Sequence, residues 1–150
     1  MIDAKHPRFP GLRVLVVEDY YLMAESTAMT LTDFGCEVVG PAGQLEKAME
    51  LAEHEPLDGA LVDINLRGKL AFPVGLILRR RNIPFALVTG YGDQFKVIDE
   101  LADTPRLEKP YTIDKLRSLL AVWASARFGA TAPAHRVSHK FATRAAVPGA

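Results

Sequence analysis

Four of the five short apolar segments of the sequence lead to a polar residue that could take part in chemistry. Glu18 and Asp19 end the first segment, Asp63 the third, Thr89 the fourth and Lys109 the fifth. Three carboxylates brought together would repel one another and raise at least one pKa unless a cation lay between them. Hard oxygen ligands without His or Cys suit Mg²⁺ better than zinc, and a lysine and a hydroxyl can bind phosphate oxygens. These residue types together are suited to phosphoryl transfer onto a carboxylate, where catalysis is mostly positioning and charge neutralisation.

The segments that must position these residues alternate between strand-like and helix-like patterns. Apolar or β-branched runs predict strands at residues 13–19, 36–42, 59–65, 85–90 and 106–110. The segments between and after them have the apolar spacing of helices, with Pro73 opening the third, Asp93 capping the fourth and Thr112 capping the fifth. The predicted buried stripes of the last two helices are Phe95, Ile98 and Leu101 for the fourth, and Ile113, Leu116, Leu120 and Trp123 for the fifth.

This alternation predicts an open, doubly wound α/β fold with a five-stranded parallel sheet and five helices. Parallel neighbours need a crossover connection, which helices supply. The first, third and fourth strands are apolar on both faces, as central strands covered on both sides must be. In such sheets the site lies outside the carboxyl ends of the strands. The five polar residues named above are predicted to meet there.

The composition is that of an ordinary soluble domain. The chain has 150 residues, 49% hydrophobic and 24% charged, and its 18 basic and 18 acidic residues balance. This balance predicts neither a nucleic-acid nor a membrane partner. The single cysteine, Cys36, suits a reducing compartment and is expected to pack as a small apolar side chain. No signal peptide or membrane span is recognisable, so the protein is expected in the cytoplasm.

The domain is predicted to cover residues 12–128, after an N-terminal extension at 1–11. Residues 129–150 are rich in Ala, Pro, Thr and Gly, and their charged residues are all basic. We expect this segment to be a flexible basic tail. The alternative is a small basic amphipathic helix, because three basic residues recur there every four positions.

The set Glu18-Asp19, Asp63, Thr89 and Lys109-Pro110 resembles the receiver domain of two-component response regulators, over residues 12 to about 125. The resemblance implies a flavodoxin-like sheet with strand order 2-1-3-4-5. It also implies that Asp63 accepts a phosphoryl group from the phosphohistidine of a histidine kinase. Lys109 and Pro110 would be joined by a cis peptide.

The same resemblance implies a magnesium site beside Asp63. Asp19, Asp63 and the backbone carbonyl of Asn65 would bind Mg²⁺, and Glu18 would act mainly through water. Thr89 and Lys109 would bind the phosphoryl oxygens, with the small Gly90 leaving room for the phosphate.

Two stretches, PFALVTGYGD (84–93) and DINLRG (63–68), are more narrowly similar to stand-alone receivers of the FATGUY type. Arg106 stands three residues before the lysine, where many receivers carry a rotating Tyr or Phe. Tyr111 or Tyr91 is expected to take over that aromatic role.

The resemblance further implies that partners and homodimers bind the surface formed by the fourth helix, the fifth strand and the fifth helix. The candidate residues of this signalling surface are Tyr91, Phe95, Arg106 and Tyr111. Packing in the core or at its rim is the alternative for the aromatic residues. The run Arg79–Arg81 is interpreted as a solvated helix end instead of a nucleic-acid patch, because its charges run around the helix.

The sequence thus predicts a single-domain response regulator that accepts a phosphoryl group and signals through protein contacts. The expected partners are a cognate histidine kinase and a downstream protein, and no enzymatic activity is expected beyond self-catalysed phosphoryl transfer. A phosphate sink or relay intermediate fits equally. A second hypothesis, motivated by Arg106, is a scaffold that binds a kinase regardless of phosphate. A third is a flavodoxin-like enzyme, but VEDYYLMA after the first strand carries acids where a phosphate loop needs glycines.

Overall fold

The computed structural model describes residues 8–90 and 96–129. Residues up to Tyr111 form one compact unit, and a second unit begins at Thr112. The expectations for Tyr91, Phe95 and the tail after residue 129 lie outside the described residues.

A five-stranded parallel sheet lies at the centre of the first unit. Its strands are β1 (Arg13–Val17), β2 (Glu37–Ala42), β3 (Gly59–Asp63), β6 (Phe85–Thr89) and β7 (Arg106–Glu108). They lie in the order β2-β1-β3-β6-β7 and every neighbouring pair is parallel. This is the predicted order 2-1-3-4-5. The central strands β1, β3 and β6 are buried on both faces almost throughout, which explains their continuous apolar runs.

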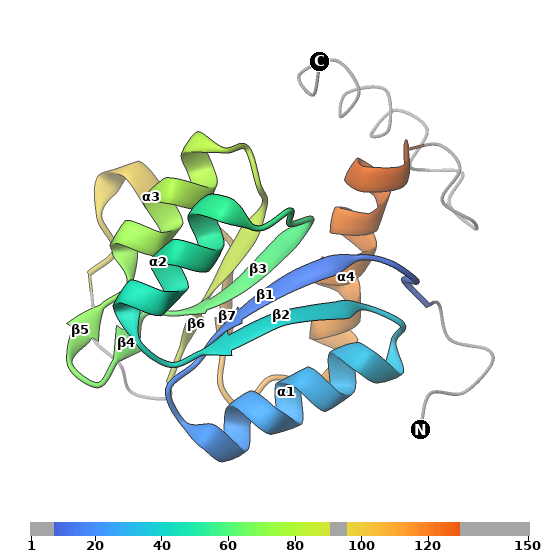
Figure 1. Ribbon diagram of the computed structural model, residues 1–150, viewed down its shortest axis with the longest axis horizontal. Coiled ribbons are helices and arrows are strands. Elements are labelled where there is room, and N and C mark those ends of the chain that lie inside the picture. Colours follow the sequence, from blue (N-terminus) through green and yellow to red (C-terminus); the bar gives the residue numbers. More distant parts are fainter. Residues whose placement is uncertain (1–7, 91–95, 130–150) are drawn as a thin grey trace. The chain divides into compact units, whose positions relative to one another are not determined.

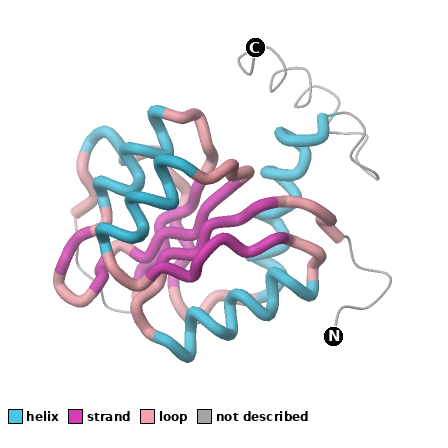
Figure 2. Tube along the Cα trace, in the orientation of Figure 1, coloured by secondary structure: helices cyan, strands magenta, loops and turns pink. Residues whose placement is uncertain are grey.

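Helices cover both faces of this sheet. In the first unit these are α1 (Tyr21–Asp33), α2 (Leu45–His54) and α3 (Phe72–Arg80). Figure 1 shows α2 and α3 side by side on one face, with α1 on the opposite face. The same layers can be followed in Figure 2, where the strands are magenta and the helices cyan. The fold is therefore doubly wound, as predicted.

The segment after β3 contains a small hairpin that the sequence did not predict. Strands β4 (Asn65–Leu66) and β5 (Lys69–Leu70) pair antiparallel. Strands of two residues are too short to produce a periodic pattern. The hairpin lies at one edge of the first unit in Figure 1, beside the start of α2.

The prediction of a fourth α-helix capped by Asp93 was wrong for the residues that the structure describes. Residues 96–98 are not helical, and Asp99–Leu101 form a 3₁₀-helix. Its bonds are of the i to i+3 kind, from Leu101 N to Ile98 O and from Ala102 N to Asp99 O. Pro105 lies beyond this segment and biases Thr104 away from helical geometry.

The part of the second unit that the structure describes contains one helix, α4 (Ile113–Phe128). Thr112 caps it as predicted, because its Oγ1 accepts a hydrogen bond from Lys115 N at 3.1 Å. Three members of the predicted stripe are buried, namely Leu116, Leu120 and Trp123. Ile113 is 52% exposed instead, since a side chain at the first helical position has no preceding turn to pack over.

Two further expectations are resolved by side-chain contacts. Cys36 is buried, as predicted, and burial raises the pKa of its thiol to about 12. Each residue of Arg79–Arg81 binds a partner within the protein: Arg79 binds Asp103 and Thr104, Arg80 binds Glu53, and Arg81 binds carbonyl oxygens at the end of α2. These contacts support the interpretation as a helix end. Among the described residues, no helix has the length and apolar character needed to cross a bilayer.

Candidate phosphoacceptor site

The register of the sheet brings the predicted site residues to one level. Val17 of β1 is opposite Val62 of β3, so that Glu18 and Asp63 follow at the same height. Asp63 is in turn opposite Val88 of β6. Since parallel strands end at the same edge, the chemistry-bearing residues gather there while the strand interiors stay apolar.

The three carboxylates form one cluster, as the sequence predicted. Glu18, Asp19 and Asp63 each offer an oxygen, and these oxygens lie within 4.8 Å of one another. Glu18 and Asp63 are buried, at 6% and 4% exposure, and Asp19 is half-buried. Buried carboxylates this close repel one another unless cations balance them. The cluster therefore supplies several hard oxygen ligands with little cost of further desolvation.

Lys109 supplies one of the balancing charges. Its Nζ lies 2.8 Å from Glu18 Oε1 and 2.9 Å from Asp63 Oδ2. Its backbone N–H donates to the carbonyl of Thr89 at 2.8 Å, which holds the loop after β7 against the end of β6. The Lys109–Pro110 peptide is cis. Burial lowers the pKa of Lys109, but its hydrogen bonds with Glu18 and Asp63 outweigh that effect and the pKa lies above its ordinary value.

The charged form of Glu18 is disfavoured by its surroundings. Burial raises its pKa above the ordinary value, and the negative charge of Asp63 raises it further. The hydrogen bonds from Lys109 and from the backbone N–H of Tyr20, at 3.0 Å, lower it but do not offset the burial. The cluster is thus deficient in positive charge, which favours a bound cation.

Asp63 is held by the chain that follows it. Its Oδ1 accepts a hydrogen bond from the backbone N–H of Asn65 at 3.1 Å. The Oδ1 of Asn65 in turn accepts from the backbone N–H of Gly68 at 2.7 Å. Asp63 is therefore tied to the β4–β5 hairpin through two successive hydrogen bonds.

Thr89 and Gly90 end the neighbouring strand. Thr89 is the last residue of β6, Gly90 follows it, and both are half-buried. The register pairs Thr89 with Glu108, directly before Lys109. All the residues predicted for metal and phosphoryl binding thus lie at the carboxyl ends of β1, β3, β6 and β7 or directly after them.

The residues expected at a signalling surface are not gathered in this way. Arg106 is exposed at the start of β7. Tyr111 is half-buried, and its hydroxyl lies 2.7 Å from that of Thr27 on α1. Tyr91 and Phe95 are outside the described residues.

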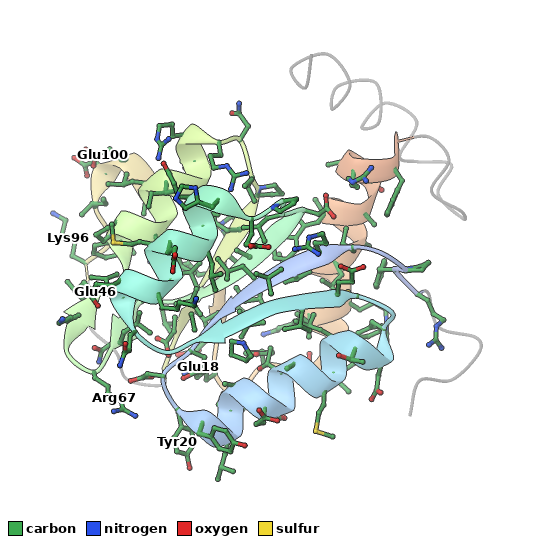
Figure 3. All side chains as sticks on the ribbon, in the orientation of Figure 1. Glu18, Tyr20, Glu46, Arg67, Lys96 and Glu100 are labelled. Atoms are coloured by element: carbon green, nitrogen blue, oxygen red, sulfur yellow. The ribbon has the colours of Figure 1, made fainter. Side chains whose placement is uncertain are left out.

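Two contacts at this end of the molecule were missed in the sequence. Arg67 Nε lies 3.8 Å from Asp19 Oδ2, and Thr27 is buried on α1 against Tyr111. In Figure 3, Arg67 and Glu18 lie at the same end of the first unit. The dipeptide Arg67-Gly68 gives only a weak signal, because the typical two-residue hairpin turn has Asn, Asp or Gly before the final Gly. A lone threonine on a helix gives no comparable signal.

Proteins of known sequence and structure resemble this chain over most of its length. The transcriptional regulatory protein PdtaR of Mycobacterium tuberculosis is 30% identical over 118 residues, which cover 76% of this chain and 55% of PdtaR. The solution structure of SdrG from Sphingomonas melonis Fr1 is 33% identical, with a TM-score of 0.66, and the match covers 75% of this chain and 96% of SdrG.

The receiver domain of a Francisella response regulator is 21% identical, which shows the fold alone. Its TM-score is 0.65, and the match covers 78% of this chain and 99% of that domain. The chain spans about half the length of the curated relatives it matches. No family model matches the sequence.

Proposed function

This chain belongs to the response regulator receiver domains of two-component systems, and on that premise we propose that it accepts a phosphoryl group on Asp63 from a histidine kinase, with Mg²⁺, and signals through protein contacts. One observation carries the proposal. The carboxylates of Glu18, Asp19 and Asp63 meet within 4.8 Å, and the ammonium of Lys109 bridges two of them.

Asp63 is the proposed nucleophile. A carboxylate oxygen of Asp63 attacks the phosphorus of the kinase's phosphohistidine, and the P–N bond breaks. Its electron pair stays on the imidazole nitrogen, which then takes up a proton. The hydrogen bond from Asn65 N to Oδ1 and the contact of Lys109 with Oδ2 fix the carboxylate before the reaction. A fixed orientation lowers the entropic part of the barrier.

The donor set fits Mg²⁺. Asp19, Asp63 and the backbone carbonyl of Asn65 would hold the ion, and Glu18 would act through water. All of these ligands are oxygens, as Mg²⁺ requires. When bound, Mg²⁺ supplies positive charge that balances the carboxylates and the transferring phosphoryl group.

The remaining site residues are proposed to bind the phosphoryl group once it is attached. Lys109 Nζ is close enough to Asp63 to move from the carboxylate to a phosphoryl oxygen. The hydroxyl of Thr89, at the end of the adjacent strand, would donate to another oxygen, and Gly90 would leave space beside it. Drawing Thr89 and its loop inward is the proposed switch, since added charge shifts a two-state element.

The receiver is proposed to cover residues 12–128, and its surface around β7 to bind a downstream protein. Exposed Arg106 is the described residue that supports this. Homodimer formation through the surface around β7 is a further proposal. It is tested by measuring the mass of the protein in solution before and after phosphorylation.

Phosphorylation itself is tested with acetyl phosphate and Mg²⁺. Intact-mass spectrometry is expected to show one phosphoryl adduct on the wild-type protein and none on Asp63→Asn. The matched control is Asp58→Asn, because Asp58 precedes the opposite end of β3 and its Oδ2 accepts a bond from Arg13 N. That variant should be phosphorylated like the wild type. An adduct that survives in Asp63→Asn would exclude Asp63 as the acceptor.

The alternative is a scaffold that binds its kinase regardless of phosphate, and the exposed Arg106 in place of the usual aromatic residue favours it. Partner binding would be compared for wild type and Asp63→Asn, each with and without acetyl phosphate and Mg²⁺. Signalling predicts that only the phosphorylated wild type changes its affinity. Equal binding in all four conditions would favour the scaffold.

A further inference from the structure

Arg67 occupies an unusual backbone position. It has φ +52° and is followed by Gly68 with φ +90°, between the paired residues Leu66 and Lys69 of the β4–β5 hairpin. Two-residue hairpin turns with positive φ at both central positions normally carry Asn, Asp or Gly. A long side chain is uncommon there. An outlier of this kind points to a role for the side chain.

The side chain of Arg67 contacts the acidic cluster. Its Nε lies 3.8 Å from Oδ2 of Asp19, which is 18% exposed, whereas Arg67 itself is 80% exposed. The neighbouring Lys69 has the same charge but lies 3.6 Å from Glu46 on α2 instead. Of the two cations on this hairpin, only Arg67 has an ion pair with a proposed metal ligand.

The hairpin is also linked to the phosphoacceptor. Asn65 N donates to Asp63, and Asn65 Oδ1 accepts from Gly68 N in the turn. The turn that carries Arg67 is thus held in place relative to Asp63 by two hydrogen bonds from backbone N–H groups to side-chain oxygens. The position of Arg67 relative to the cluster follows from this anchoring.

There is space for the guanidinium to leave the cluster. A recess of about 390 Å³ lies beside Asp19, between the start of α2 and the hairpin, and Arg67 and Lys69 line it. An exposed arginine with open space beside it can change rotamer at small cost.

We propose that Arg67 competes with the divalent cation for Asp19. The guanidinium of Arg67 pairs with Asp19 in the metal-free protein and thereby sets the affinity for Mg²⁺. The inference rests on the proposed magnesium site and adds a residue that does not bind the metal. Binding of the dication requires Asp19 to exchange the guanidinium for the ion, and the positive charge that remains nearby opposes binding. The receiver then loads with Mg²⁺ only when the free concentration is high enough to displace Arg67.

The test is a direct measurement of metal binding by the full chain, without phosphorylation. Mn²⁺ is titrated at low ionic strength and followed by the electron paramagnetic resonance of the free ion, with Mg²⁺ as competitor. Arg67→Asn removes the charge and suits the turn, so that the hairpin is retained. Arg67→Lys retains a charge, and Lys69→Gln removes the same charge from the same hairpin without touching Asp19.

Arg67→Asn is expected to bind both ions about threefold to tenfold more tightly than wild type, and the difference should shrink in about 0.5 M NaCl. Arg67→Lys and Lys69→Gln should stay within about twofold of wild type. Unchanged affinity of Arg67→Asn, or an equal gain in Lys69→Gln, would overturn the competitor role while leaving the magnesium site intact. Failure of the wild type to bind either ion would overturn both.

Discussion

The hydroxyl of Tyr111 lies 2.7 Å from the hydroxyl of Thr27, and this hydrogen bond joins the loop after β7 to α1. Thr27 is buried, and Tyr111 stands two residues beyond Lys109. The segment from Lys109 to Tyr111 is therefore attached to helix α1 by the hydrogen bond between Tyr111 and Thr27. This contact gives Tyr111 a definite structural role.

Removing either hydroxyl should destabilise the protein moderately. Tyr111→Phe and Thr27→Val are each expected to lower the free energy of unfolding by about 1 kcal/mol, the usual net contribution of a partly buried hydrogen bond. The double variant should lose less than the sum, because the two changes remove the same bond. Urea unfolding of the four proteins measures this. Strict additivity would show that the hydroxyls do not interact.

The same pair predicts a dependence on alkaline pH. Burial raises the pKa of Tyr111 above its ordinary value of 10.0, although the bond with Thr27 lowers it. A raised pKa means that the folded state favours the neutral phenol. Tyr111 therefore contributes stability that is complete below about pH 10 and is lost as the pH rises through the raised value.

Unfolding of wild type and Tyr111→Phe between about pH 8 and pH 11 tests this sign. The stability advantage of the wild type should be constant up to about pH 10 and then decline. The pKa of Lys109 is also raised, but its effect is common to both proteins and cancels. An advantage that grows above pH 10 would contradict the assignment.

Lys109 should be essential to the stability of the cluster without metal. Lys109→Met leaves the buried carboxylates of Glu18 and Asp63 without their cation and is expected to cost about 3 kcal/mol at pH 7. Part of this loss should be recovered at lower pH, where Glu18 can take up a proton. Lys109→Arg keeps the charge and should cost less. Thermal unfolding in EDTA measures all three proteins, and a neutral effect of Lys109→Met would mean that the ion pairs contribute little.

Asp19→Asn should stabilise the protein in EDTA and reduce the additional stability that Mg²⁺ gives. In EDTA it removes one of three mutually repelling carboxylates, and a gain of up to about 1 kcal/mol is expected, reduced by the loss of the ion pair with Arg67. With Mg²⁺ the wild type should gain stability by mass action and the variant should gain less. The control is Asp103→Asn on the exposed Asp103, paired with Arg79, which should respond to Mg²⁺ like wild type.

Much of this site could be predicted because its residues lie at or next to the ends of strands. The apolar runs before Asp63 and Thr89 indicate buried strands, and the polar residue at each end marks the edge of the sheet where ligands bind. The alternation of strands and helices then limits the connections to a doubly wound sheet. The acidic cluster and the placement of Lys109 follow from these two arguments, whereas the order of the strands was implied by the resemblance to receiver domains.

The other features of the fold and the site depend on local geometry that leaves no pattern in the sequence. A 3₁₀-helix at Asp99–Leu101 stands where an α-helix was predicted. The hairpin carrying Arg67 has strands of only two residues. The Thr27–Tyr111 bond joins residues 84 positions apart in the sequence, and a contact at that separation has no local signature.

The central claim is that the phosphoryl group resides on Asp63. An acyl phosphate, unlike a phosphoserine or phosphothreonine, is reduced by borohydride to the corresponding alcohol. The protein is treated with acetyl phosphate and Mg²⁺, reduced, digested and sequenced by mass spectrometry. We predict homoserine at position 63 and unmodified Asp19 and Glu18. Reduction at another carboxylate, or a phosphoryl group that resists borohydride on a hydroxyl residue, would contradict it.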